Sequence, residues 1–276
     1  MNQLPEKILV IGPSWVGDMV MSQVLYRFLQ ETRPGVVIDV AAPVWSEPIL
    51  ERMPEVNRAI TKAIGHGELA LGRRWKLGRG LRAEHYDQAI MLPNSFKSAL
   101  VPWFAGIPRR TGWRGEMRYG LLNDMRVLRE QDLPLMVQQF AALGQDASAV
   151  LPEVLPTPRL VVDEIQAREC RDKFGIAADM PILALCPGAE FGSAKRWPAE
   201  YYGQLAKQFL DRGWQVALFG SINDQGVTAQ IAAASGASER CFDLAGRTQL
   251  AEAVDMLSLA TAVVSNDSGL MHIAAA

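Results

Sequence analysis

The sequence predicts an α/β protein with two halves, each built on a parallel β-sheet covered by helices. Short, unbroken apolar runs alternate with longer segments in which apolar residues recur at helical spacing. This alternation is typical of parallel sheets, because their strands are buried on both faces and are joined by helical crossovers. The stretch LPEVLPTPRL at 151–160 holds three prolines and interrupts the alternation, as a linker does. We therefore expect two Rossmann-like domains, at 1–152 and 160–276, with a cleft between them.

The elements of the first half follow from the same reasoning. Apolar runs predict strands at 7–12, 36–41 and 86–92. Between the first two strands, Val20, Val24 and Phe28 recur at helical spacing, which predicts a helix over 18–31. An apolar segment near 95–105 predicts the helix that follows the third strand.

After the linker the pattern restarts. Strands are expected at 182–186, 215–219 and 262–265, and helices at 198–212, 224–235 and 250–260. The last strand continues into SNDSGLMHIAAA, where a short polar segment separates it from the first turns of a final helix.

Composition excludes several classes of protein. With 276 residues and a net charge of −2, the chain does not resemble a dedicated nucleic-acid-binding protein. Cys170, Cys186 and Cys241 show no CxxC or metal-ligand spacing, which is typical of reduced cytosolic cysteines. The N-terminus MNQLPEKILVIG lacks the long apolar core of a signal peptide, and no window approaches the ~18 apolar residues of a membrane span. We expect a cytoplasmic protein.

The charge is unevenly distributed along the chain. Residues 58–126 hold 13 Lys and Arg against 5 Asp and Glu, whereas the second half is acidic overall. Such a basic surface is either simply solvated or binds a polyanionic partner, and the sequence leaves both open.

The loop after the first strand, Gly12-Pro-Ser-Trp-Val-Gly-Asp18, carries a candidate catalytic group. It resembles a Walker A phosphate loop only superficially, because Asp18 stands where that motif requires lysine. It also lacks the GxGxxG pattern, so a nicotinamide-dependent enzyme is not expected. A carboxylate at a helix N-terminus is kept ionised by the helix dipole, which suits a general base. The alternative is that Asp18 is a plain N-cap.

Two loops of the second half are candidate phosphate sites. In CPGAEFGSAKRWP, at 186–198, glycines allow close backbone approach, and Lys195 supplies a cation just before the helix that Pro198 begins. The alternative for this loop is a solvated Lys-Arg pair. In SNDSGLMHIAAA, the backbone amides of Ser268 and Gly269 start a helix and can bind phosphate oxygens.

The side chains around these amides suit a sugar rather than a phosphate. Asp267 would repel phosphate, so it is expected either to cap the helix or to accept hydrogen bonds from sugar hydroxyls. His272 lies one turn further on the same face as Ser268, although a lone helical histidine is more often structural. A base on one half, with a phosphate and hydroxyl site on the other, predicts a sugar-nucleotide transferase. Without a DxD motif, the sequence implies no metal ion.

Four blocks of the sequence closely resemble one family, the bacterial ADP-heptose:lipopolysaccharide heptosyltransferases. They are GPSWVGDMVMSQ, LPNSFKSALVPWFAGIPRRTGWRGEMRYGLLND, CPGAEFGSAKRWP and SNDSGLMHIAAA. The similarity extends over essentially the whole chain, and the long middle block is most similar to the heptosyltransferase II branch. The resemblance implies a glycosyltransferase-B fold with the donor on the C-terminal domain and the acceptor on the N-terminal one. The family continues past the position of Ala276 with a strand, a loop and a helix, so we expect an incomplete C-terminal domain.

The resemblance also implies roles for individual residues. Asp18 matches the family's proposed catalytic base, and Lys195 matches the lysine that holds the donor phosphates. The family's donor-site acid has no clear match, although Asp224 is nearby. The donor site is expected to comprise Gly188, Lys195, Asp224, Asp267, Ser268, Gly269 and His272. The acceptor site is expected to comprise Asn94, Lys97, Arg110, Arg114 and Arg118.

Arginines crowd the segment from Arg109 to Arg118. They follow neither the helical nor the strand period, so we expect them on a loop or edge beside the cleft. There they would pair with the Kdo carboxylates and lipid A phosphates of the acceptor, or hold the protein near an anionic membrane.

The implied reaction moves L-glycero-D-manno-heptose from ADP-heptose to the first heptose of heptosyl-Kdo2-lipid A, with inversion and without a metal cofactor. The expected partners are ADP-heptose, the lipid A-linked acceptor and the cytoplasmic face of the inner membrane, bound peripherally, but no nucleic acid. Two alternatives stay open. One is heptosyltransferase I or another nucleotide-sugar transferase of the same fold, and the other is a non-catalytic sugar-nucleotide-binding module.

Overall fold

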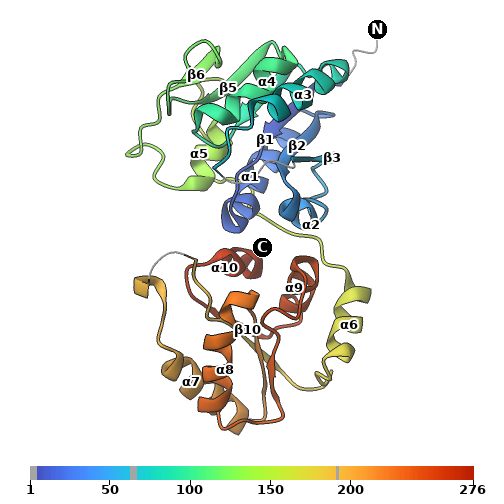
Figure 1. Ribbon diagram of the computed structural model, residues 1–276, viewed down its shortest axis with the longest axis vertical. Coiled ribbons are helices and arrows are strands. Elements are labelled where there is room, and N and C mark those ends of the chain that lie inside the picture. Colours follow the sequence, from blue (N-terminus) through green and yellow to red (C-terminus); the bar gives the residue numbers. More distant parts are fainter. Residues whose placement is uncertain (1–4, 63–66, 191–192) are drawn as a thin grey trace. The chain divides into compact units, whose positions relative to one another are not determined.

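The chain divides into two compact units, one ending at Arg159 and the other beginning at Leu160. The computed structural model describes residues 5–62, 67–190 and 193–276. In each unit, parallel strands alternate with helices, which confirms the predicted α/β class (Figure 1). Residues 1–4 of the N-terminal segment and Phe191–Gly192 of the CPGAEFGSAKRWP loop lie outside the described residues.

The first unit holds a six-stranded sheet in the order β3-β2-β1-β4-β5-β6, with every neighbouring pair parallel. From the central β1 the chain first adds strands on one side and then returns to add β4, β5 and β6 on the other, as in Rossmann folds. The strands are β1 (Lys7–Ile11), β2 (Val37–Pro43), β3 (Arg58–Lys62), β4 (Gln88–Met91), β5 (Arg109–Trp113) and β6 (Asp124–Arg126).

Helices cover this sheet because its strands are apolar on both faces. Leu9 and Ile11 of β1 share a buried cluster with Leu81 and Val101, which come from two adjacent helices. The helices of this unit are α1 (Val16–Thr32), α2 (Glu47–Leu50), α3 (Leu71–Leu81), α4 (Leu100–Ala105) and α5 (Met136–Ala142). Short 3-10 turns are η1 (Val44–Ser46), η2 (Arg82–Glu84) and η3 (Phe96–Ala99).

The proline-rich segment 151–159 packs against α1. Leu151 and Leu155 lie against the buried cluster that includes Val24 and Phe28 of α1. The Gln23 side chain also bonds both backbone groups of Arg159, donating to its oxygen at 2.9 Å and accepting from its nitrogen at 2.8 Å. This segment is therefore part of the first unit rather than a free tether.

The second unit holds a four-stranded parallel sheet in the order β10-β7-β8-β9. Leu183 and Leu185 of β7 pack on Tyr202 and Ile231 from the helices. The strands are β7 (Ile182–Cys186), β8 (Gln215–Leu218), β9 (Cys241–Asp243) and β10 (Ala262–Ser265). The helices are α6 (Glu164–Lys173), α7 (Ala199–Asp211), α8 (Gln225–Ala234), α9 (Leu250–Leu257) and α10 (Gly269–Ala275), with 3-10 turns η4 (Ser193–Lys195) and η5 (Ile222–Asp224).

The strands predicted from apolar runs are confirmed as β1, β2, β4, β7, β8 and β10, within two residues at each end. The predicted helices are confirmed as α1, α7, α8 and α9, and the apolar segment near 95–105 forms η3 and α4. Short or polar elements were not predicted, namely β3, β5, β6, β9, α2, α3, α5 and α6. No helix in the described part of the chain is long and apolar enough to cross a membrane.

Gly78 allows α3 to pack closely on α4. A Cβ atom at this position would lie 2.5 Å from Phe104 Cβ and 2.8 Å from Val101 O. Real Cβ atoms do not approach backbone so closely, so the helices would have to move apart. The glycine is required by contact rather than by backbone conformation.

We expect Gly78→Ala to lower the free energy of unfolding by about 1–3 kcal/mol, the range for overpacked sites. Urea denaturation followed by circular dichroism would measure this change. Gly80→Ala is the matched control in the same helix, because nothing lies within 4 Å of its added Cβ. It should raise stability by up to about 1 kcal/mol through helix propensity. Equal effects of the two substitutions would contradict the packing explanation.

Candidate functional site

The first candidate site is a cavity at the carboxyl edge of the first sheet. β1 and β4 are neighbours in the sheet although they are not consecutive in the sequence, so their loops leave this edge in different directions. A cavity of about 1030 Å³ lies here. Its walls include Ser14 after β1, Val44 after β2, Asn94 after β4 and Trp113 at the end of β5. Rossmann sheets bind their ligands at this position.

Asp18 lines this cavity from the first turn of α1. The helix begins at Val16 and its N-cap is Trp15, so the alternative that Asp18 is the N-cap is wrong. As the third helical residue, Asp18 places its half-buried carboxylate where the helix dipole favours negative charge. The structure thus presents to the cavity the carboxylate that was predicted to be a general base.

Asn94 and Lys97 also line the cavity. Asn94 belongs to the loop after β4, and Lys97 belongs to η3. The wall also includes charged and aromatic residues that sequence reasoning did not assign to a site, among them Arg74, Trp113 and Glu116. Arg74 comes from α3, an unpredicted element, and its guanidinium donates to backbone oxygens, including Lys97 O at 3.1 Å. Glu116 accepts a hydrogen bond from Phe96 N at 2.7 Å and so links the loops after β4 and β5.

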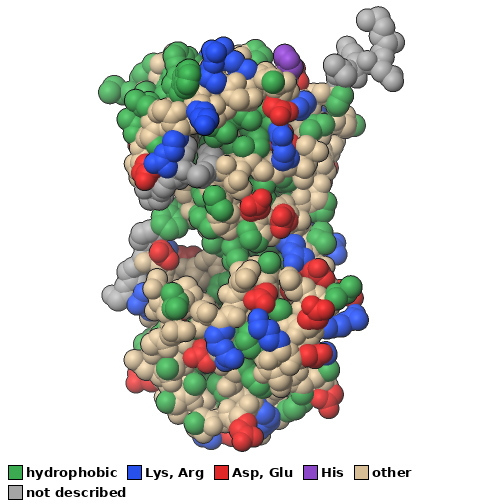
Figure 2. All heavy atoms as spheres, turned by 45° about the vertical axis from the view of Figure 1, so that its right-hand side comes forward, with side chains coloured by type: hydrophobic (Ala, Val, Ile, Leu, Met, Phe, Trp, Pro, Cys, Tyr) green, Lys and Arg blue, Asp and Glu red, His purple; other side chains and the backbone are tan. Residues whose placement is uncertain are grey.

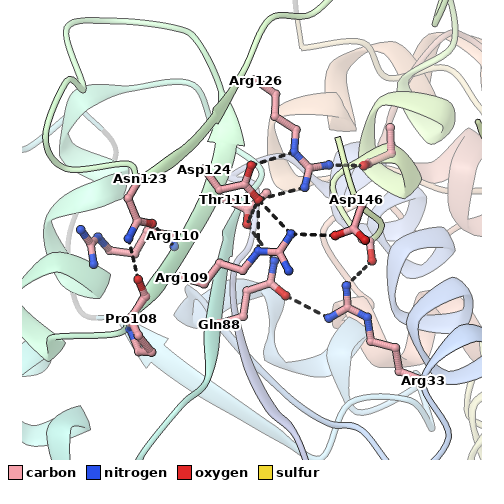
Figure 3. Close-up of polar contacts among 12 residues, drawn as sticks. Arg33, Gln88, Pro108, Arg109, Arg110, Thr111, Asn123, Asp124, Arg126 and Asp146 are labelled. Atoms are coloured by element: carbon pink, nitrogen blue, oxygen red, sulfur yellow. Dashed lines mark hydrogen bonds and ion pairs between the residues drawn. The ribbon is translucent and has the colours of Figure 1, made fainter. Parts of the chain in front are cut away.

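Arg109 and Arg110 are the first two residues of β5, so the expectation that they lie on a loop is wrong for both. β5 is flanked by β4 and β6, and its amino end lies at the edge of the sheet opposite the cavity. Arg109 pairs with Asp124 and Asp146 (Figure 3). The Arg110 guanidinium donates to the backbone oxygens of Leu121 and Ile107, at 2.6 and 2.5 Å.

The strand β5 was not predicted because its polar residues interrupt the alternation of apolar and polar residues that is typical of strands. Figure 3 shows that Arg109, Thr111 and Arg126 gather around one carboxylate, Asp124. These contacts lower the pKa of Asp124 against the opposing effect of its burial. This partly buried ionic network stands where the sequence pattern of a strand would show alternating apolar residues.

The other two arginines differ sharply in exposure. Arg114 directly follows β5 and its side chain is exposed, whereas Arg118 is completely buried. Neither belongs to the cavity wall. Of the expected acceptor residues, the structure therefore brings only Asn94 and Lys97 to the cavity surface.

The second candidate site lies at the equivalent place in the second unit, where β7 and β10 are neighbours. Asn266, only 6% exposed, joins the loops that follow these two strands. Its Nδ2 donates to Pro187 O at 2.7 Å, and its Oδ1 accepts from Trp197 N and Tyr202 Oη at 3.1 and 3.0 Å. Sequence analysis did not single out this residue, because a buried amide role has no local signature.

Lys195 and Asp267 form an ion pair at this edge, with 2.5 Å between Nζ and Oδ2. The hydrogen bond from Lys195, and next its charge, hold the pKa of the Asp267 carboxyl below its usual range. The adjacent Arg196 instead donates to Ala189 O at 2.9 Å, so the two cations of the Lys-Arg pair have separate partners. Half of each side chain in the ion pair is exposed, which leaves Lys195 accessible to an incoming anion.

α10 begins immediately after this ion pair. Its N-cap is Ser268, so the option that Asp267 caps the helix is wrong. Gly269 is its first residue, and the half-buried His272 lies one turn further along. Electrostatic interaction with His272 also contributes, to a smaller extent than Lys195, to lowering the pKa of Asp267. The imidazole is therefore close enough to Asp267 to influence its charge.

Gly188 and Asp224 are brought together from the loops after β7 and β8. A Cβ at Gly188 would lie 2.9 Å from both carboxylate oxygens of Asp224. That carboxylate accepts hydrogen bonds from the backbone and the hydroxyl of Ser221, both at 2.8 Å, and so caps η5. The donor-binding role of Asp224 stays a prediction. Across 5–62, 67–190 and 193–276, no cluster of three or more His, Cys, Asp or Glu side chains is arranged to hold a metal ion.

Residues 74–276 match the model of glycosyltransferase family 9 (heptosyltransferase). The chain belongs to this family. It is 55% identical to lipopolysaccharide heptosyltransferase 2 of Escherichia coli strain K12, covering 98% of this chain and 80% of the relative. The corresponding protein of Salmonella typhimurium strain LT2 is 53% identical, with the same coverage.

A solved structure gives the same result for the fold. The structure of E. coli ADP-heptose lps heptosyltransferase II superposes on this family 9 chain with a TM-score of 0.90 and 53% identity. The match covers 98% of this chain and 81% of the other. The predicted family and the glycosyltransferase-B fold class are therefore confirmed.

The Lys195–Asp267 pair makes a testable prediction about titration. In Lys195→Ala, we expect the pKa of Asp267 to rise toward the usual aspartate value of about 3.9, because the main cause of its depression is gone. The stabilisation that the pair provides is present above the usual pKa and is lost as the pH falls through the lowered one. Carbon-13 NMR titration of the aspartate carboxyls would measure the shift.

Lys207→Ala serves as the control, because Lys207 makes a similarly exposed pair with Asp211 in α7. It should leave the titration of Asp267 unchanged. An Asp267 pKa that is the same in wild type and Lys195→Ala would show that the ion pair does not persist in solution.

Proposed function

We propose that this family 9 glycosyltransferase transfers L-glycero-D-manno-heptose from ADP-heptose to the first heptose of heptosyl-Kdo2-lipid A. The similarity to heptosyltransferases 2 at more than half of all positions supports this choice of acceptor. The single structural observation that carries the proposal is the Asp18 carboxylate in the wall of a large cavity at the carboxyl edge of the first sheet.

In this reaction Asp18 accepts the proton of the acceptor hydroxyl as its oxygen attacks the anomeric carbon of the heptose. The bond from that carbon to the phosphate oxygen breaks at the same time, so ADP leaves with the electron pair and the configuration is inverted. General-base help of this kind contributes about 10²–10⁴-fold to a rate. Asn94, Lys97 and the exposed Arg114 are proposed to contact the acceptor, with Arg110 and Arg118 reaching it only indirectly.

The second site is proposed to bind the donor. Lys195 would exchange its carboxylate partner for a donor phosphate, and the amides of Ser268 and Gly269 would meet the charge that develops on departing ADP. Asp267, released from Lys195, would accept hydrogen bonds from donor hydroxyls beside His272, with Gly188 allowing close approach and Asp224 holding the neighbouring loop. We propose that these groups serve without a metal ion.

A transfer assay tests the proposal. Wild-type protein with ADP-heptose should extend heptosyl-Kdo2-lipid A by one heptose, equally with and without EDTA. The Asp18→Asn variant should bind ADP-heptose normally and lose roughly 10²-fold or more in turnover, because an amide cannot take the proton. Mass spectrometry of the lipid product measures turnover, and calorimetry with ADP-heptose in the absence of the acceptor measures binding.

Each other result has a distinct meaning. Transfer only to the heptose-free acceptor would indicate heptosyltransferase I, and binding without turnover would indicate a sugar-nucleotide-binding module. Wild-type turnover in Asp18→Asn would remove Asp18 from the mechanism. Loss of turnover in EDTA that Mg²⁺ restores would contradict the metal-free proposal.

We also propose that the protein works in the cytoplasm at the anionic face of the inner membrane, where its lipid-linked acceptor lies. The exposed side of α3 supports this, with Leu71 50% and Trp75 52% exposed beside Lys76 and Arg79. The Arg79 guanidinium lies 5.8 Å from the centre of the Trp75 ring. Figure 2 shows Lys and Arg side chains among hydrophobic ones on the face of the first unit that it draws. Aromatic and basic side chains together suit an anionic lipid interface.

A Trp75→Ser, Arg79→Gln double variant should sediment less with phosphatidylglycerol vesicles than wild type does. The control is an Ile165→Ser, Arg168→Gln variant, which removes one exposed apolar and one exposed basic residue from α6. Wild-type protein should bind phosphatidylcholine vesicles weakly, because about 1 kcal/mol per basic residue is lost without anionic lipid. Equal sedimentation of both variants would contradict the assignment to α3.

A further inference from the structure

Arg118, from the connection between β5 and β6, lies wholly inside the first unit, at 0% exposure. Nη1 donates to Pro93 O at 2.8 Å and to Ser98 Oγ at 3.2 Å. Nη2 donates to Trp113 O and, at 3.4 Å, to Asn94 Oδ1. A single side chain from the β5–β6 connection thus joins the loop after β4 to the end of β5.

All four of these partners belong to the cavity wall, whereas Arg118 does not. Gly115 allows the segment after β5 to lie directly against the loop after β4, because an added Cβ at this position would clash with Asn94 O. The guanidinium is therefore placed to fix the cavity wall without being exposed to what the cavity binds.

This arrangement is costly for stability. Burial lowers the pKa of the Arg118 guanidinium, which means that the fold disfavours the charge it encloses. Among the described residues, Arg118 Nε and Trp113 Nε1 are the two buried side-chain nitrogens without a hydrogen-bond partner. Replacing a buried charged group with well-packed apolar residues is often neutral or stabilising. A buried charge that does not benefit stability is therefore expected mainly at functional sites.

We infer that Arg118 is a positioning residue of the acceptor site, which holds Asn94 and the end of β5 in place before the acceptor binds. The inference rests on the proposed function, because it takes the cavity to be the acceptor site. It replaces direct pairing of Arg118 with acceptor carboxylates or phosphates. Lysine cannot substitute for it, since one ammonium cannot reach both loops as the planar guanidinium does.

Steady-state kinetics of Arg118→Lys give the first test. The acceptor KM should rise about tenfold, the equivalent of roughly one net hydrogen bond, while the KM for ADP-heptose stays unchanged. Arg33→Lys is the matched control, because Arg33 bonds Glu6, Gln88 and Gly144 O, at the edge of the same sheet opposite the cavity. Figure 3 shows its contact with Gln88. It should lower the melting temperature without changing the acceptor KM. An unchanged acceptor KM in Arg118→Lys would overturn the inference.

A double-mutant cycle separates positioning from contact. If Arg118 acts through Asn94, the effects of Arg118→Lys and Asn94→Ala on the acceptor KM should be clearly less than additive. Additive effects would mean that Arg118 reaches the acceptor independently, which would contradict a positioning role.

Hydrogen exchange tests the inference even if the wild type transfers no heptose. The amides of Phe96 and Glu116 are bonded across the two joined segments, to Glu116 Oε2 at 2.7 Å and to Asn94 O at 3.2 Å. In Arg118→Lys, peptides containing these amides should exchange faster than in wild type or Arg33→Lys. Unchanged exchange would show that the guanidinium does not hold the segments, whatever the substrate of the enzyme is.

Discussion

The parallel pairing of β1 with β4, and of β7 with β10, is the constraint on which both candidate sites depend. At each pair the chain switches from one side of the sheet to the other, so the two following loops diverge and leave space between them. Asp18 and Asn94 follow the first pair, and Lys195 and Asp267 follow the second. The same topological event therefore produces a cavity with a carboxylate in one unit and an exposed ion pair in the other.

In each unit a buried polar side chain fixes one of the diverging loops. In the second unit, Asn266 joins the loops after β7 and β10 through an amide whose hydrogen bonds have ordinary lengths. In the first unit, the charged Arg118 joins the loop after β4 to the end of the neighbouring strand β5. The two side chains differ in the free energy of burying them. A neutral amide whose hydrogen bonds are all made costs little to bury, whereas a buried guanidinium loses the hydration of its charge. In the first unit this unfavourable desolvation occurs directly behind the wall of the cavity that Asp18 lines.

The sequence predicted those parts of the fold that depend on apolar periodicity, and it predicted the site residues that directly follow apolar strands. Asp18 was identified because it follows the predicted strand β1, and Asp267 because it follows β10. Ligands of parallel sheets bind at the edge where the strands end. The strand Arg109–Trp113 was missed because it begins with two arginines, of which Arg109 joins a partly buried ionic network with Asp124. The exposure of Arg118 was misjudged for a related reason. A charged residue is normally solvated, and only the surrounding carbonyl oxygens show that this one is not.

The bracing of α1 by residues 151–159 has a consequence for dividing the protein into fragments. Composition alone suggests cutting before the prolines, but Leu155 packs on α1 and Arg159 bonds Gln23 in the same helix. A fragment that stopped at Pro152 would expose the apolar side of the helix whose first turn carries Asp18. For expression, crystallisation or domain exchange, the boundary that preserves these contacts lies after the prolines, at Arg159.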